Sequence, residues 1–147
     1  MSAATSAVTV PLFQGATQYW QTLTDECSRL REAINEAASQ KGAARDELIQ
    51  WHAGPAIRMT KAAYPSTSVK VSIDFPSWGP VISGSITGRP DGKRTFASDH
   101  FEMPIARDLD GGIVAIFDEG RSFSPRELAC YLAQSFHRCY PRISLPC

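Results

Sequence analysis

Residues 68–75 read SVKVSIDF, and apolar and polar side chains alternate at every step of this stretch. Because successive side chains of a β-strand point to opposite faces of a sheet, a period of two is typical of a strand with one buried face. The apolar members Val69, Val71, Ile73 and Phe75 would face the core, and the polar members Lys70, Ser72 and Asp74 would face outward. This stretch therefore predicts a β-sheet that is buried on one side only.

The same alternation recurs further along the chain. One face of residues 79–88 carries Ile82 and Ile86 and the other Ser83, Ser85 and Thr87, while in residues 100–106 Phe101, Met103 and Ile105 oppose His100 and Glu102. Residues 113–117 (IVAIF) are apolar on both faces, as in a central strand, and residues 56–63 are a less regular candidate. Glycine, with proline or aspartate beside it, marks turns at 89–94 and 107–112. We expect an antiparallel meander of four or five strands.

A helical stripe precedes the strands. Its members recur at steps of three and four residues: Ala16, Trp20, Leu23, Cys27, Leu30, Ile34 and Ala37, then Ala44, Leu48 and Trp51. Gly54 and Pro55 would end this helix. A continuous helix over 12–52 would be roughly 60 Å long, whereas a domain of this size is only about 40 Å across. Either the helix breaks near Gly42, which we favour, or it projects and pairs with another chain as a coiled coil.

The closing helix has the clearest local signal. In residues 123–128 (FSPREL), Ser124 is a natural N-cap, Pro125 suits the first helical position and Glu127 completes a capping box. The helix should run to about Tyr140, where Pro141 stops it. The whole predicts one α+β domain over 1–147, a two-layer sandwich with both helices on one sheet face, and residues 1–10 as a loose tail or edge strand.

Composition excludes several classes of function. The 147 residues carry a formal net charge of zero, so no global charge favours nucleic acid or an anionic membrane. No apolar run approaches the ~20 residues of a membrane span, and residues 1–10 lack the pattern of a secretory signal. Four irregularly spaced cysteines, at 27, 130, 139 and 147, do not resemble a disulfide scaffold. We expect a cytoplasmic protein with all four cysteines reduced.

Charge is distributed unevenly along the predicted strands. Residues 57–98 hold six bases and two acids, and residues 99–120 hold one base and six acids. If these segments are neighbouring strands, their charges should pair across the sheet. The alternative is two exposed patches of opposite sign that meet a bipolar partner.

The candidate metal ligands do not converge. On a helix His137 and Cys139 point about 160° apart, and Cys130 and His137 lie roughly 10 Å apart along the axis, too far for one zinc ion. Residues 108–119 have acids at three positions of a calcium loop, but Ile113 stands where that loop requires glycine. We expect a hairpin turn there, no metal site and no cofactor.

The residues that best suit a functional site lie on the outward face of the predicted sheet. Its candidate binding residues are Lys70, Asp74, Ser83, Ser85, His100 and Glu102. We expect a non-enzymatic binding or protein-interaction module whose partner is a protein or a small molecule. One alternative is a small hydrolase or isomerase that uses His100 and Glu102 as acid and base. Another is a carrier that holds an apolar ligand between helices and sheet.

The long stripe also predicts self-association. A sheet of four or five strands is only about 19–24 Å wide, while the segment up to Gln40 would extend roughly 40 Å as a helix. The overhang would leave an apolar strip in water, which two-fold pairing would cover. We therefore expect a homodimer.

Overall fold

A computed structural model describes residues 11–52, 54–63, 66–88, 97–118, 120–140, 142–144 and 147. Two sequence predictions, the tail at residues 1–10 and the turn at 89–94, lie outside these residues. The described chain forms two helices, two short 3-10 segments and an antiparallel sheet. This is an α+β arrangement, as the sequence predicts.

In the described ranges the sheet is a meander of seven strands, each paired with its neighbours in the chain. The strands are β1 Gln50–His52, β2 Ile57–Lys61, β3 Thr67–Asp74, β4 Val81–Gly88, β5 Ala97–Arg107, β6 Ile113–Asp118 and β7 Arg121–Phe123. The sequence predicts β2 to β6 but misses β1 and β7. Each of these outer strands has three residues, which is too short for alternation to show.

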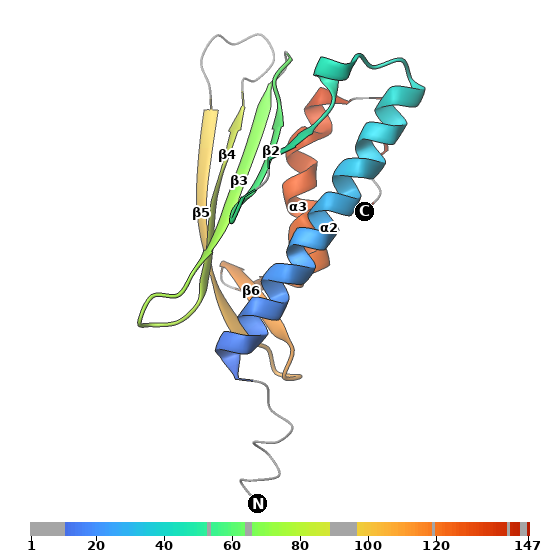
Figure 1. The fold of residues 1–147 in the computed structure, drawn as a ribbon. Coiled ribbons are helices and arrows are strands. Elements are labelled where there is room, and N and C mark those ends of the chain that lie inside the picture. The colour runs from blue at the N-terminus through green and yellow to red at the C-terminus, as the bar shows by residue number, and fades with distance from the viewer. Residues whose placement is uncertain are drawn as a thin grey trace, which may run out of the picture.

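Both helices lie on one face of the sheet, which gives two layers (Figure 1). The first, α2, spans Leu12–Gln40, and a 3-10 turn, η1, follows at Arg45–Glu47. The closing helix α3 spans Pro125–Ala133 and continues as a 3-10 helix, η2, at Gln134–Cys139. The predicted capping box begins α3, because the Glu127 backbone N–H donates to Ser124 Oγ and the Ser124 backbone N–H donates to the Glu127 carboxylate.

The N-terminal helix breaks where the sequence predicts. Gly42 has a φ of +87°, a left-handed conformation that favours glycine and ends the helix. The predicted continuation of the helical stripe beyond this point is wrong, since Trp51 lies on strand β1. Asn35 holds the returning chain against α2. Its side-chain amide donates to the Ile49 carbonyl oxygen at 2.9 Å and accepts from the Ile49 N–H at 2.8 Å.

The helical stripe is buried within the chain's own core. Leu23, Leu30 and Ile34 are at most 1% exposed and belong to the same cluster as Val71 of the sheet and Leu132 of α3. The sequence argument compared helix length with sheet width. In the fold, α2 follows the length of the strands (Figure 1), and the 11 residues of β5 span about 37 Å. The apolar overhang on which the dimer prediction rested is therefore not present along these residues.

Phe75 departs from its predicted place in the core. Strand β3 ends at Asp74 and Pro76 follows, so the alternation stops one residue before the sequence pattern does. The Phe75 side chain is 42% exposed and its ring centroid lies 4.4 Å from that of Phe13, at the start of α2.

The prediction of four reduced cysteines is also wrong. Cys130 and Cys147 form a disulfide, with Cα atoms 5.8 Å apart, while Cys27 and Cys139 are not disulfide-bonded. Cys130 lies on α3, and the disulfide places Cys147 against this helix. Sequence spacing does not show this pairing, because it depends on the path of the chain after Tyr140.

Candidate functional site

The predicted site residues share the face of the sheet that points away from the helices, which we call the open face. Strand register places Lys70, Ser85 and His100 side by side across β3, β4 and β5. The next outward row holds Ser72, Ser83 and Glu102. A one-residue slip would turn these side chains inward, so burial of the opposite face determines where they lie.

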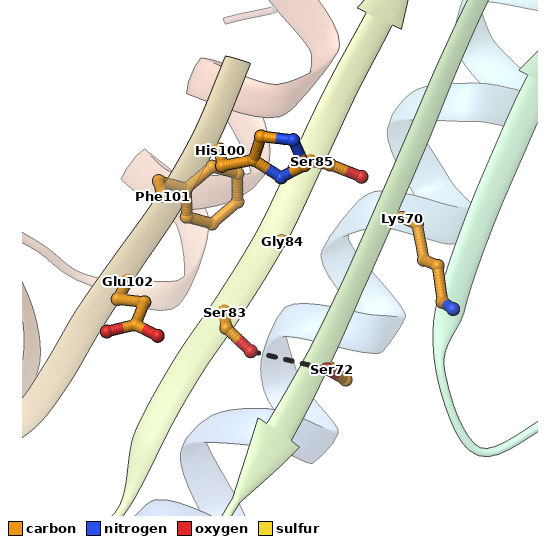
Figure 2. Close-up of a pocket in the computed structure, with 8 residues that line it drawn as sticks. All are labelled: Lys70, Ser72, Ser83, Gly84, Ser85, His100, Phe101 and Glu102. Carbon is orange, nitrogen blue, oxygen red and sulfur yellow. Dashed lines mark hydrogen bonds between the residues drawn. The ribbon is translucent and has the colours of Figure 1, made fainter. Parts of the chain in front are cut away.

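These two rows line a cavity of about 260 Å³ (Figure 2). Its lining residues are Lys70, Ser72, Ser83, Gly84, Ser85, His100, Phe101 and Glu102. Small side chains on β4 leave space between the longer side chains of β3 and β5, which explains the hollow. Five of the six predicted site residues line it. The sixth, Asp74, lies beside it and accepts a hydrogen bond from Ser83 Oγ at 3.4 Å.

Gly84 and Phe101 form the floor of this cavity, and the sequence analysis did not assign either to the site. A Cβ atom on Gly84 would lie 2.6 Å from both the Lys70 carbonyl oxygen and the Phe101 ring. The missing side chain lets the Phe101 ring pack across β4, where it also meets Tyr131 of α3 edge-on at 6.4 Å. A glycine inside a strand is the signal that could have revealed this close approach.

The polar groups around the cavity point in different directions. Ser72 and Ser83 hydroxyls lie 3.5 Å apart, and in Figure 2 the His100 ring extends toward Ser85 while the Glu102 carboxylate points away from it. An acid–base pair would need both groups at one reacting atom. The arrangement instead offers separated donors and acceptors along a shallow surface.

Three of the six bases in the expected cross-strand pairing, Arg89, Lys93 and Arg94, lie outside the described residues. Among the described residues the ion pairs join Arg29 to Glu26, Arg31 to Glu32 and Arg121 to Asp118, all close in sequence. Arg58 and Lys70 take part in none of these pairs. The two exposed cations are therefore available to a partner.

The other residues considered as ligands are spread over separate parts of the fold. Asp108 accepts hydrogen bonds from the backbone N–H groups of Asp110 and Gly112, which confirms the predicted turn. His137 is exposed on η2, and the Cys139 sulfur lies 3.4 Å from Thr67 Oγ1. Across the described ranges, no three His, Cys, Asp or Glu residues are placed to hold a metal ion.

A second cavity, of about 430 Å³, lies beside α3 and not on the open face. It is lined by Phe123, Arg126, Glu127, Cys130, Tyr131, Gln134 and Cys147. Its lining thus combines α3, the start of η2, Phe123 of β7 and Cys147, and the carrier hypothesis stays a prediction. In the part of the chain that the structure describes, no helix is long and apolar enough to cross a membrane.

The site thus combines two rows of polar side chains, a hollow over β4 and a glycine–phenylalanine floor. No family model matches the chain, and neither a curated protein nor a solved structure matches it.

Proposed function

We propose that the protein is a non-enzymatic binding module whose open face receives a small polar ligand. The observation that carries this proposal is the cavity over β4, where Lys70, Ser85, His100 and Glu102 offer donors, acceptors and both signs of charge around one hollow. Ligand sites in proteins are concave and place a few polar groups around the ligand. The hollow has both properties.

The scaffold favours binding because it holds these side chains on paired strands. Each lining residue belongs to β3, β4 or β5, and continuous cross-strand pairing joins these strands over eight residue pairs on each side of β4. Sites built on strands keep their geometry better than sites built on loops. Little ordering would therefore be needed when a ligand arrives.

Nuclear magnetic resonance of the ¹⁵N-labelled protein with a library of polar fragments tests the proposal. Fragments that bind should shift the amide signals of residues 70–72, 83–85 and 100–102. Ser85→Trp should abolish these shifts by filling the hollow, while Gln21→Trp, on the exposed side of α2, should leave them unchanged. Lys70→Ala provides a second, smaller change in case the tryptophan disturbs the sheet. A library in which no fragment shifts the open face would overturn the proposal.

The acid–base enzyme stays an alternative with a direct test. His100→Ala should leave fragment binding elsewhere in the hollow measurable under the binding proposal. Loss of a turnover activity on a hydrolysable or isomerisable substrate in this variant would instead favour the enzyme.

Self-association also stays a proposal, now without the exposed stripe that suggested it. Leu30 is 1% exposed, so Leu30→Glu should unfold the protomer rather than separate two copies. Sedimentation of the unmodified protein decides the matter, because a single species near 16.1 kDa is a monomer.

The proposed cytoplasmic location loses part of its support. It rested in part on cysteine spacing unlike that of a disulfide scaffold, and disulfides such as Cys130–Cys147 persist mainly in oxidising compartments.

A further inference from the structure

Strand register aligns basic side chains across the open face. His52 on β1 lies opposite Arg58 on β2, and Arg58 lies opposite Lys70 on β3. Ser85 and His100 continue the same row across β4 and β5. At a strand spacing of about 4.8 Å the row is roughly 19 Å long. The row takes one residue from each of five strands, so no run of charged residues in the sequence indicates it.

Arg58 and Lys70, the arginine and the lysine of this row, stand directly opposite each other. Hydrogen-bonded and non-hydrogen-bonded residue pairs alternate along antiparallel strands. The Ile105 N–H donates to the Pro80 carbonyl oxygen at 3.0 Å, so Pro80 and Ile105 form a hydrogen-bonded pair. From this pair the type of every other pair across β5, β4, β3 and β2 follows. Counted through the continuous register, Arg58 and Lys70 form a non-hydrogen-bonded pair. The Cα atoms of such pairs are only about 4.5 Å apart and their side chains lie closest.

Like charges in direct cross-strand opposition destabilise a sheet. Both side chains are exposed, and Figure 2 shows Lys70 extending from β3 to the side away from Ser85, where β2 lies. Its ammonium group therefore lies on the side of the sheet that carries Arg58. An anion placed between the two groups would turn this repulsion into attraction.

Among the described residues of the open face, the carboxylates Asp74 and Glu102 stand at positions distant from the pair. Asp74 lies four residues from Lys70 along β3, or about 13 Å, and Glu102 lies two strands and two residues away, or about 12 Å. Exposed charges at such separations are largely screened at physiological ionic strength, where the Debye length is about 8 Å. The basic pair keeps its positive potential.

We propose that Arg58 and Lys70 form a binding site for a phosphate group. A phosphate dianion matches two adjacent cations in charge, and the planar Arg58 guanidinium can donate two hydrogen bonds to it while Lys70 acts as a point charge. The hollow over β4 adjoins Lys70 and would hold the organic part of a phosphate ester. This inference rests on the proposed binding role of the open face, and it names the chemical class of the ligand.

The test is a titration of the ¹⁵N-labelled protein with inorganic phosphate and with phenyl phosphate, against sodium chloride of matched ionic strength. Both phosphates should shift the amide signals of residues 57–60 and 69–71 in a saturable manner. Phenyl phosphate should also shift residues 83–85 if the natural ligand is an ester; shifts confined to the basic pair indicate free phosphate.

Substitution of either cation should weaken phosphate binding by about tenfold, the loss expected for a charge-assisted hydrogen bond. The variants are Arg58→Gln and Lys70→Gln, and the matched control is Arg126→Gln, which removes an exposed arginine from α3. The control should bind phosphate as the unmodified protein does.

The outcomes separate the two proposals. If fragments bind the hollow but neither phosphate shifts the basic pair, or if all three variants bind phosphate equally, the phosphate site is refuted and the binding module stands. If fragments and phosphates both leave the open face unshifted, both proposals fail. A short single-stranded oligonucleotide that shifts the entire row while phenyl phosphate does not would replace the phosphate site with a surface for polyanions.

Discussion

Removing the Cys130–Cys147 disulfide should cost a large part of the stability of this protein. The bridge joins residues 17 apart, and Cys147→Ser breaks it at the exposed end. Closing a loop of this size lowers the entropy of the unfolded chain by about 10 cal/mol/K, which corresponds to roughly 3 kcal/mol at 25 °C. Small domains have total free energies of unfolding of about 5–15 kcal/mol, so a loss of this size should be easy to measure.

Urea denaturation of the unmodified protein and of Cys147→Ser, each with and without reductant, measures this difference. The unmodified protein should be more stable by about 3 kcal/mol without reductant, and it should fall to the level of the variant when reductant is added. The variant itself should not respond to reductant, because it lacks the Cys130–Cys147 disulfide.

Alkylation before mass measurement provides the independent check. It must be done on the unfolded protein, because Cys27 is buried and burial raises the pKa of its thiol to about 12. Two alkylated cysteines without reductant and four with reductant are expected. Four alkylated cysteines in both samples, or equal urea midpoints for the two proteins, would refute the reasoning.

Three further predictions concern stability. Ser124→Ala should cost about 1 kcal/mol in urea denaturation, because it removes the oxygen that accepts the Glu127 N–H; an unchanged midpoint would show that the cap contributes nothing. Gly84→Ala should cost about 1–3 kcal/mol because its Cβ would meet both the Lys70 carbonyl oxygen and the Phe101 ring, and a neutral result would mean that the strand and the ring both shift to make room. Burial raises the pKa of Tyr19 well above its ordinary 10, so its stabilising effect is complete below about pH 10 and is lost above it. Urea midpoints should therefore fall as pH rises beyond 10, and less steeply in Tyr19→Phe.

Short sequence patterns predicted most helices and strands of the fold, because each of these elements is determined by residues close together in the sequence. The alternation at Val69 and Val71 reflects one buried sheet face, and the stripe through Leu23 and Leu30 reflects one buried helix face. Ser124 predicts the start of α3, because its cap hydrogen bond joins residues only three positions apart. Boundaries were less predictable, since the three-residue strands are held by pairing with neighbours rather than by their own pattern.

The candidate site was predicted only as a set of residues on one face. Ser83, Ser85 and His100 follow from alternation alone, because a period of two assigns each to the outward side. The hollow between them was not predictable, since it depends on which small side chain lies beside which long one. The role of Gly84 was hidden for the same reason: the ring that fills its space comes from another strand.

The sequence by itself determined the element types, the break near Gly42 and the polar character of the open face, because these depend on side-chain periodicity and backbone conformation within short segments. Tertiary structure alone decided that Arg58 stands beside Lys70, that Cys147 returns to Cys130, and that the long helix lies along the strands. Each of these depends on strand register or on the path of the chain between distant segments. The physical reason is that packing of the whole core selects register and path, and no local pattern encodes that selection.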